Sequence, residues 1–392
     1  MTELKWPLMK NNINWQDKWR LVKFILTTNQ YTQGTKVQKF EQDWNDWLGS
    51  QHSLFVTSGS TANTLLVDAC MEKFDIPVGS KVLLPATTWM TNVAPPIQLG
   101  LDPIFCDINI TNYGFDKQHA EILAKQHPDI RLIFVSHLLG YYQDHAYLQD
   151  LFPQALIIED ICESHGCLAE QGHKAGSKSL GATFSFYFGH HMTSIEGGVV
   201  STCDSELYDL MKMKRSHGMA RHSKHFQDYA QQHANIDPAF LFVTMGYNFR
   251  NTELAAVLAS SQLQRLDDFI RIRNDNYLAV CKLVNKAPQL FEPIHFSNQT
   301  SSFCFPLVAK TTSIREEFQR LCKLYGIEYR PIVSGNLLQQ PFLKKYSNTH
   351  MPNAQTLHNL GMYIGNNQFV GSEQLVLLEK ILVELHKSTP LV

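Results

Sequence analysis

The 392-residue sequence has no long hydrophobic run and little charge of either sign. Charged residues make up 18% of it, and 34 basic against 36 acidic residues leave a net charge of -2. Without a run of 18 or more apolar residues no membrane-spanning helix is predicted, and the N-terminus lacks the pattern of a signal peptide. A balanced charge offers no cationic surface for nucleic acid or for an anionic membrane. We therefore expect a soluble, cytoplasmic protein.

Cysteine motifs are missing as well. The chain has eight cysteines, but they form no CxxC pair and no cluster. Neither a disulfide framework nor a zinc finger is therefore expected. The histidines also lack the HExxH spacing of zinc enzymes, so no metal site is predicted.

The apolar segments that are present alternate with stretches of helical periodicity between Ser53 and Val200. Such alternation is typical of an α/β domain with a parallel sheet. The runs are too uniformly apolar for half-exposed strands, so helices starting near Thr61, Thr91, Asp116 and Asp144 are expected on both faces. The predicted strands are Ser53–Val56, Lys81–Leu84, Pro103–Asp107, Arg131–Ser136, Leu156–Asp160, Thr183–Phe188 and Val199–Thr202.

The pattern changes after residue 250. One long connecting helix is predicted from Asn251 through Asn274, and shorter mixed segments follow it. At about 150 residues per domain, the length fits a large α/β domain over 1–250 and a second part over 251–392. That second part would hold the connecting helix and a small α+β domain, with an apolar stretch at Ser302–Val308 and helices at Ser313–Tyr325 and Ser372–Lys387. A cleft between the domains is the expected place for a site.

The first segment with chemical potential is Thr57-Ser58-Gly59-Ser60-Thr61, where a strand runs through a turn of small residues into a helix. Free backbone amides at a helix N-terminus, together with hydroxyl groups, suit a phosphate dianion. An ordinary N-cap is the alternative interpretation. The turn is neither a GxGxxG fingerprint nor a Walker A loop, so a dinucleotide or nucleoside triphosphate is not the expected ligand.

The second segment is Leu156-Ile157-Ile158-Glu159-Asp160, an apolar strand that ends in two carboxylates. Ligand sites of open α/β sheets lie at such strand ends. One of the two acids is expected to be functional, although the alternation of the strand does not choose between them. A helix cap is the alternative role.

The third segment places the pair His190-His191 between two apolar runs, shortly before Glu196-Gly197-Gly198. Adjacent histidines in a loop between strands favour proton transfer more than an isolated histidine does. Metal binding is the weaker alternative, because the other histidines nearby lack a zinc spacing.

In order and spacing, these segments resemble the pyridoxal-phosphate-dependent sugar aminotransferase and dehydratase family of fold type I. The resemblance extends over nearly the whole chain. It implies a mostly parallel central sheet with helices on both faces and a smaller C-terminal α+β domain. Further segments that carry it are Tyr31–Gly34, Pro85–Trp89, Glu163–Gly166, His217–Met219, Gly246–Arg250 and Tyr329–Val333.

The resemblance also implies roles for single residues. Gly59, Ser60 and Ser185 would hold the cofactor phosphate, and Trp89 would stack on the pyridine ring. Asp160 would pair with the ring nitrogen and keep it protonated, which makes the ring an electron sink.

Four further residues are assigned with alternatives beside them. Glu163 would hydrogen-bond near the cofactor hydroxyl or activate the amine, unless it only caps a turn. Asn248 would reach the phosphate of a neighbouring subunit, which predicts a homodimer with shared active sites. His217 would orient the cofactor or the substrate, or make a structural hydrogen bond. The fork of Arg330 would clamp a carboxylate or a sugar phosphate, or form a surface ion pair.

One position departs from the family pattern. The aminotransferases carry their Schiff-base lysine seven residues before Gly197, where this chain has His190. An imidazole cannot form an imine with pyridoxal phosphate, but it transfers protons well near neutral pH. The same exchange is found in the GDP-4-keto-6-deoxy-D-mannose 3-dehydratases, which this chain resembles.

The resemblance implies that glutamate converts the cofactor to pyridoxamine phosphate. The amine then condenses with a keto-sugar, and His190 removes a proton from carbon C4′ while the C3 hydroxyl leaves as water. The expected function is C3 dehydration of a nucleotide-linked 4-keto-6-deoxy sugar for bacterial surface polysaccharide (O-antigen or lipopolysaccharide).

Two other functions stay open at this point. The chain resembles aminotransferases as well, so a lysine-free aminotransferase acting on a keto- or aldehydo-sugar, such as an octulosonate, is the alternative. A non-catalytic sensor or scaffold is the third. Related CDP-sugar dehydrases hold an iron-sulfur cluster with closely spaced cysteines, and this chain has no matching cluster, so no iron is expected.

Overall fold

The computed structural model describes residues 4–388. Its helices are α1 Trp15–Thr27, α2 Thr35–Leu48, α3 Gly59–Lys73, α4 Ala94–Gln98, α5 Lys117–Gln126, α6 Ala146–Leu151, α7 Ser205–Lys214, α8 Phe226–Gln232, α9 Glu253–Leu263, α10 Leu266–Val284, α11 Thr312–Tyr325, α12 Pro352–Leu360 and α13 Ser372–Ser388. Its strands are β1 His52–Val56, β2 Lys81–Pro85, β3 Asp102–Cys106, β4 Ile130–Ser136, β5 Leu156–Asp160, β6 Ala182–Ser185, β7 Gly198–Thr202, β8 Cys304–Val308, β9 Tyr329–Pro331 and β10 Gly361–Gly365.

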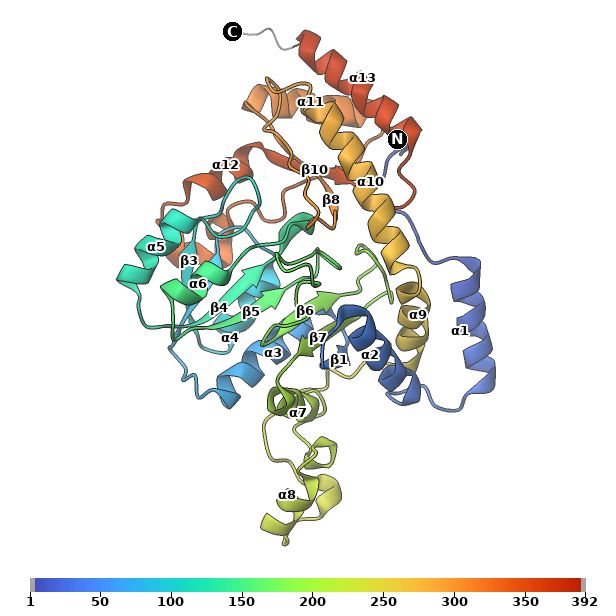
Figure 1. The fold of residues 1–392 in the computed structure, drawn as a ribbon, viewed down its shortest axis with the longest axis vertical. Helices are drawn as coiled ribbons and strands as arrows, with labels where there is room; N and C mark the ends of the chain where they lie inside the picture. Colours follow the sequence, from blue (N-terminus) through green and yellow to red (C-terminus); the bar gives the residue numbers. More distant parts are fainter. Residues whose placement is uncertain (1–3, 389–392) are drawn as a thin grey trace.

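The first seven strands form one sheet in the order β1-β7-β6-β5-β4-β2-β3 (Figure 1). Only β7 runs antiparallel to its neighbours, so the prediction of a mostly parallel sheet is confirmed. The prediction of a strand through Phe188 is wrong, because β6 ends at Ser185. Beyond it the chain turns, with the amide of His190 donating to the carbonyl of Tyr187.

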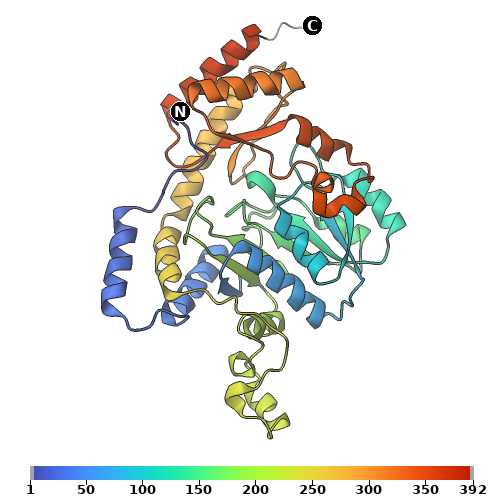
Figure 2. The same cartoon turned by 180° about the vertical axis from the view of Figure 1, so that it is seen from behind.

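Strand residues alternate between two buried faces, as the period of two in a β-strand requires. On one face, Leu54, Leu84 and Ile158 pack in the cluster that contains α3. On the other face, Phe55, Phe184 and Val199 pack against α2 and α9 at one end, and Leu83 and Ile133 pack against α5 and α6 at the other. Helices therefore cover both faces, and Figure 2 shows α3 crossing the sheet from behind.

The single long helix predicted from Asn251 through Asn274 is wrong. The structure has two helices there, α9 and α10, separated at Gln264 and Arg265. Arg265 leaves the helical region (φ -118°, ψ 2°), and its guanidinium bonds the buried carboxylate of Asp17 in α1 at 2.6 Å. No proline or glycine marks this break, so it could not be predicted from a local pattern.

The smaller antiparallel sheet, in the order β8-β10-β9, carries α11, α12 and α13. The N-terminal segment joins it, because Trp6 pairs with Ile327 and its indole donates to the carbonyl of Gly365 at 2.8 Å. One apolar cluster runs without interruption from the large sheet into the small one. The domain boundary at residue 250 stays a prediction.

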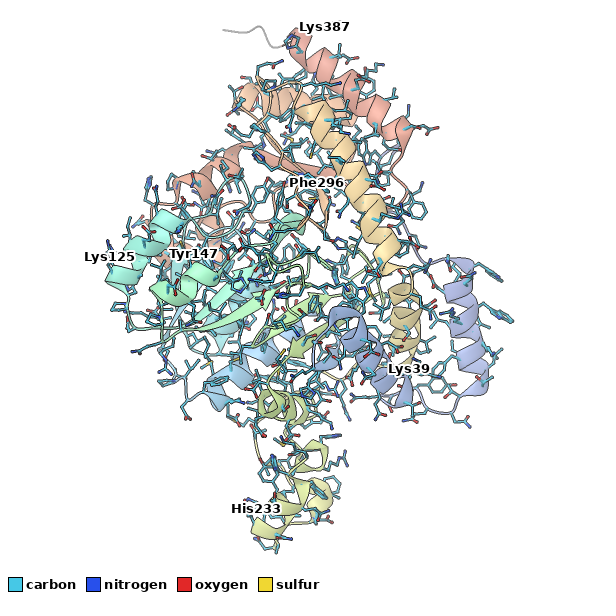
Figure 3. The ribbon with its side chains drawn as sticks, in the orientation of Figure 1. Lys39, Lys125, Tyr147, His233, Phe296 and Lys387 are labelled. Atoms are coloured by element: carbon cyan, nitrogen blue, oxygen red, sulfur yellow. The ribbon has the colours of Figure 1, made fainter. Side chains whose placement is uncertain are left out.

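Two parts of the chain stand away from this body. The segment around α8 projects from the sheet, with His233 near its far end in Figure 3. Helix α1 lies outside α9, and it turns apolar side chains to solvent, including Trp15, Trp19 and Leu26. Within residues 4–388 no helix combines the length and hydrophobicity that crossing a membrane requires.

Candidate active site

A cavity of about 450 Å³ lies at the carboxyl ends of the parallel strands and extends to the small sheet. Seven of the ten residues that the sequence singles out line it: Gly59, Ser60, Trp89, Asp160, Glu163, Ser185 and His190. No lysine is among its lining residues in the described part of the chain. The fold thus collects segments that lie more than a hundred residues apart in the sequence.

The turn before α3 is built to receive an anion. Ser58 caps the helix by accepting from the amide of Thr61, whereas the amides of Gly59 and Ser60 have no partner among residues 4–388. A side chain at Gly59 would meet the Cβ of Ser185 at 2.7 Å, so only glycine lets the turn approach that serine. Two free amides and two hydroxyl groups at a helix N-terminus suit a phosphate.

The strand β5 directs its two terminal carboxylates differently. Asp160 lines the cavity, and its oxygens accept from Asn63 Nδ2, Asn92 Nδ2 and the amide of Cys162, each at 2.9 Å. Glu159 points to the opposite face, where it accepts from His137 Nε2 at 2.8 Å. The structure therefore brings Asp160, not Glu159, into the cavity, held rigidly by three N–H donors.

Trp89 supplies an aromatic surface at the cavity wall. It follows β2 and precedes a short 3-10 turn, and its side chain is 56% exposed. An exposed indole that lines a cavity has one face free for a planar ring. Trp89 and Asp160 thus offer the two contacts that a pyridine ring needs, one to its face and one to its nitrogen.

His190 lies in the loop between β6 and β7, and its ring lines the cavity. Its Nδ1 is buried without a hydrogen-bond partner among the described residues. The ring contacts Phe303 and His165, at centroid distances of 5.4 Å and 6.1 Å. Burial lowers the pKa of His190 to about 4, and the positive charge of Arg273 adds to the effect. At neutral pH the ring is therefore unprotonated and able to accept a proton.

His191 points elsewhere, as expected for the neighbour of a cavity residue. It is fully buried outside the cavity lining, and its Nε2 lies 3.2 Å from the hydroxyl of Ser301. The two adjacent histidines therefore have different environments, and only the first faces the site.

Glu163 presents a second titratable group to the cavity. One of its oxygens accepts from the amide of Leu139 at 3.0 Å. Burial raises the pKa of Glu163 to about 7, and the nearby charge of Asp160 acts in the same direction. The carboxyl group thus changes its protonation near neutral pH, which suits a group that exchanges hydrogen bonds with a cofactor or substrate.

Three residues with ligand atoms of the kind that bind metals, His137, His145 and Glu159, lie next to the cavity. His137 Nδ1 accepts from the amide of Gln143 at 3.0 Å, so its Nε2 carries the proton that bonds Glu159. The second oxygen of Glu159 accepts from Ser179. His137 and Glu159 thus satisfy each other, while His145 Nδ1 lies 3.0 Å from the carbonyl of Gln143. The expectation that the protein uses no metal stays a prediction.

Asn248, His217 and Arg330 do not line the cavity. All three are exposed. Asn248 accepts from Arg250 Nε at 3.1 Å, and His217 has a positive φ of 66°. Arg330 makes an exposed ion pair with Glu328 at 3.2 Å. Their roles toward a cofactor or a substrate stay predictions.

Several cavity residues were missed by the sequence analysis. Leu8 and Met9 come from the N-terminal segment, Phe303 directly precedes β8, and Tyr363 lies in β10. The amide of Leu8 is fixed by Glu328 at 3.0 Å. These residues are apolar or aromatic and follow no motif, so only the tertiary fold identifies them.

Comparisons with known proteins agree with this geometry. The model of the DegT/DnrJ/EryC1/StrS aminotransferase family matches residues 14–376. A GDP-4-keto-6-deoxy-D-mannose 3-dehydratase of Yersinia pseudotuberculosis is 33% identical, covering 97% of this chain and 98% of that protein. The lipopolysaccharide biosynthesis protein RfbH of Salmonella typhimurium is 28% identical, covering 81% of this chain and 75% of that protein.

A solved structure is similar over almost the same extent. It is a GDP-4-keto-6-deoxymannose-3-dehydratase with a trapped adduct of pyridoxal phosphate and glutamate, a geminal diamine. Its TM-score is 0.86 at 27% identity, covering 96% of this chain and 100% of that one. The similarity thus includes both sheets and the cavity between them.

Proposed function

Because the chain belongs to the DegT/DnrJ/EryC1/StrS aminotransferase family, we propose that it is a pyridoxal-phosphate-dependent sugar 3-dehydratase. The substrate would be a nucleotide-linked 4-keto-6-deoxy sugar, and glutamate would be the amino donor. The observation that carries the proposal is His190, which lines the cavity where the family places its lysine. The relatives that are dehydratases, and the one named for lipopolysaccharide biosynthesis, support a role in making surface polysaccharide.

The cavity fits the cofactor in both its resting forms, pyridoxal and pyridoxamine phosphate. Gly59, Ser60 and Ser185 would hold the phosphate, and Asp160 would hold the ring nitrogen. Trp89 would cover one face of the ring. When bound, the cofactor supplies an electron-withdrawing ring that stabilises negative charge on an adjacent carbon.

His190 would move the proton. Its ring is neutral at physiological pH, and Nδ1 is free of any partner within the described chain. No lysine lines the cavity within residues 4–388. An imidazole forms no imine with the cofactor, so His190 would act only by moving protons.

Glu163 would assist beside the cofactor ring. Its carboxyl lines the same cavity as Asp160, and its pKa near 7 lets it donate or accept a hydrogen bond at physiological pH. We assign it to the cofactor hydroxyl or to the reacting amine.

The assembly that we propose is a homodimer with shared active sites. Asn248 is exposed outside the cavity of its own chain, as expected of a residue that serves a neighbouring subunit. Apolar side chains also stand exposed near it, with Phe242 51% and Met245 88% exposed. His217 and Arg330 would then contact the substrate where the two subunits meet.

A lysine-free aminotransferase is the second candidate. It is favoured by the family itself, which is named for aminotransferases, and by a cavity whose cofactor groups serve either reaction. The difference lies in what leaves: an aminotransferase only needs a proton returned to carbon, whereas a dehydratase also expels the C3 hydroxyl.

The experiment that separates the candidates follows product mass. The purified protein is incubated with pyridoxal phosphate, glutamate and a panel of nucleotide-linked 4-keto-6-deoxy sugars and keto-octulosonates. Net loss of one oxygen atom from a nucleotide sugar is the expected result. Replacement of a carbonyl oxygen by an amine would instead identify an aminotransferase. The same incubation with the His190→Asn variant serves as the control.

A further inference from the structure

A buried arginine lies behind His190, on the side away from the cavity. Arg273 is 1% exposed and belongs to α10, the helix that runs from the large sheet toward the small one in Figure 1. Its guanidinium donates to the carbonyls of Phe303 at 3.0 Å and Asn366 at 2.7 Å. A third, longer contact of 3.4 Å reaches the carbonyl of His190. One side chain therefore connects the loops that precede β8 and follow β10 with the loop of His190.

The charge of this guanidinium has no carboxylate partner among residues 4–388. Other buried cations of the chain are paired: Arg215 bonds Glu41 at 2.5 Å, and Lys214 bonds Asp68 at 2.9 Å. A buried charge without a counter-ion is costly, so such a group is rare unless its charge has a use. Nε of Arg273 also lacks a partner, which adds to the cost.

The positive charge of Arg273 acts on three histidine rings. His165 and His191 are fully buried, with ring centroids 5.2 Å apart, and His165 lies 6.1 Å from His190. After burial itself, the charge of Arg273 is the next cause that lowers the pKa of His190, and it also lowers those of His191 and His165.

The remaining charged groups near His190 lie on the cavity side. Asp160 and Glu163 line the same cavity from the end of β5 and the residues after it, and Glu196 lines it from the loop before β7. Carboxylates favour a protonated imidazole, so Arg273 opposes them from behind. The backbone of Cys162 acts in the same direction as the carboxylates. The pKa of His190 is thus lowered by burial and by Arg273, and raised by the backbone of Cys162.

We propose that Arg273 is a positioning residue for His190, which bonds the backbone of its loop and places a fixed positive charge behind its ring. The proposal rests on the proposed function only in treating His190 as the base. A ring that binds a proton weakly also gives it up readily.

The test measures the pKa of His190 in the protein without substrate, by NMR of the histidine ring carbons. The His190→Asn variant identifies the signal. Arg273→Gln removes the charge but keeps a hydrogen-bond donor. Arg273→Lys keeps the charge but loses the planar guanidinium that contacts several carbonyls. Arg271→Gln is the matched control, because Arg271 lies two residues earlier on α10 with a side chain 63% exposed.

The native protein should show His190 titrating well below the ordinary value of about 6.5. Arg273→Gln should raise that pKa by about one pH unit, the lower end of what a nearby like charge produces. Arg273→Lys should leave it low, although its turnover should fall because the carbonyl contacts are changed. Arg271→Gln should match the native protein in both measurements.

Three results would overturn the proposal. One is a native His190 that titrates near 6.5, a measurement that needs no variant to fold. Another is an unchanged pKa in Arg273→Gln, and the last is an equal rise in the glutamine and lysine variants. Because no substrate is present, the outcome is independent of whether the product assay finds a dehydratase or an aminotransferase.

Discussion

Asp160 and His190, two polar residues that line the cavity, differ in their hydrogen bonding. Asp160 accepts three hydrogen bonds of 2.9 Å, from two asparagine side chains and a backbone amide. His190 keeps Nδ1 without a partner and is surrounded by rings and a buried positive charge. A group that must keep its charge is held by donors, whereas a group that must gain and lose a proton keeps an open atom.

The largest effect on turnover is expected at His190. His190→Asn keeps a polar side chain but removes the base, so turnover should fall by about 10³-fold. Binding of pyridoxal phosphate should be nearly unchanged, because Asp160 and the turn at Gly59 are untouched. Product mass spectrometry measures the first effect, and the absorbance of the bound cofactor measures the second.

The neighbouring histidine offers the control. His191→Asn alters the neighbouring ring, which is fully buried and lies outside the cavity lining. It should lower stability and leave turnover of the folded protein within about threefold. Equal losses of turnover in the two variants would show that the pair acts as one unit, and the contrast between the two rings would be lost.

The next largest effect is expected at Asp160, on the affinity for the cofactor. Asp160→Asn removes the carboxylate that would pair with the ring nitrogen and leaves its neighbours Asn63 and Asn92 facing a neutral amide. Losing a hydrogen bond to a charged group costs about 1.5–3 kcal/mol, or about 10- to 100-fold in the dissociation constant of pyridoxal phosphate. Fluorescence titration of the apo-protein measures it.

Glu159→Gln is the matched change for that experiment. It alters the adjacent carboxylate, which bonds His137 on the other face of β5. Stability should fall while cofactor affinity stays the same. A loss of affinity equal to that of Asp160→Asn would mean that both acids, not one, support the cofactor.

Much of this arrangement could be predicted from the sequence. Apolar runs with β-branched residues give the seven strands, because strands covered on both faces need no polar alternation. The same property hides which of Glu159 and Asp160 faces the site, since both sides of β5 are buried. The turn at Gly59 and the loop at His190 were found because small or polar residues interrupt apolar runs there.

The rest depends on tertiary contacts that leave no local pattern. Met9 reaches the site only because Trp6 docks on the small sheet. In the sequence, Arg273 is indistinguishable from an exposed basic residue of an amphipathic helix, and only the tertiary structure shows that it is buried. The break between α9 and α10 is likewise fixed by the contact of Arg265 with Asp17, more than two hundred residues away in the sequence.

A smaller effect is expected at Glu163, and it depends on pH. Its pKa is raised in the folded state, so the folded protein keeps a proton that the unfolded chain loses above about pH 4.5. Stability therefore falls as the pH rises from about 4.5 through 7. In Glu163→Gln this penalty is absent, and the apo-protein should gain about 2 kcal/mol at pH 8 and nothing at pH 4.

Urea unfolding of the apo-protein at both pH values checks this. The backbone contact to Leu139 stays available to the glutamine oxygen, so the comparison isolates the ionisation. An equal shift at pH 4 and pH 8 would mean that packing, rather than charge, accounts for it.

The smallest effect is expected at Ile195, beside Glu196 in the loop of His190. This β-branched residue has φ +73°, and its side chain is 56% exposed. A left-handed conformation costs a branched residue about 1–3 kcal/mol, and glycine adopts it freely. Because little apolar surface is buried here, Ile195→Gly should stabilise the protein by about 1 kcal/mol in urea unfolding.

The turnover of Ile195→Gly shows whether that backbone strain contributes to the reaction at His190. Ile195 immediately precedes Glu196, which lines the same cavity as His190. Greater stability with lower turnover would show that the strained backbone holds Glu196 in place for the reaction. Greater stability with unchanged turnover would show that proton transfer by His190 depends only on the groups packed directly against its ring.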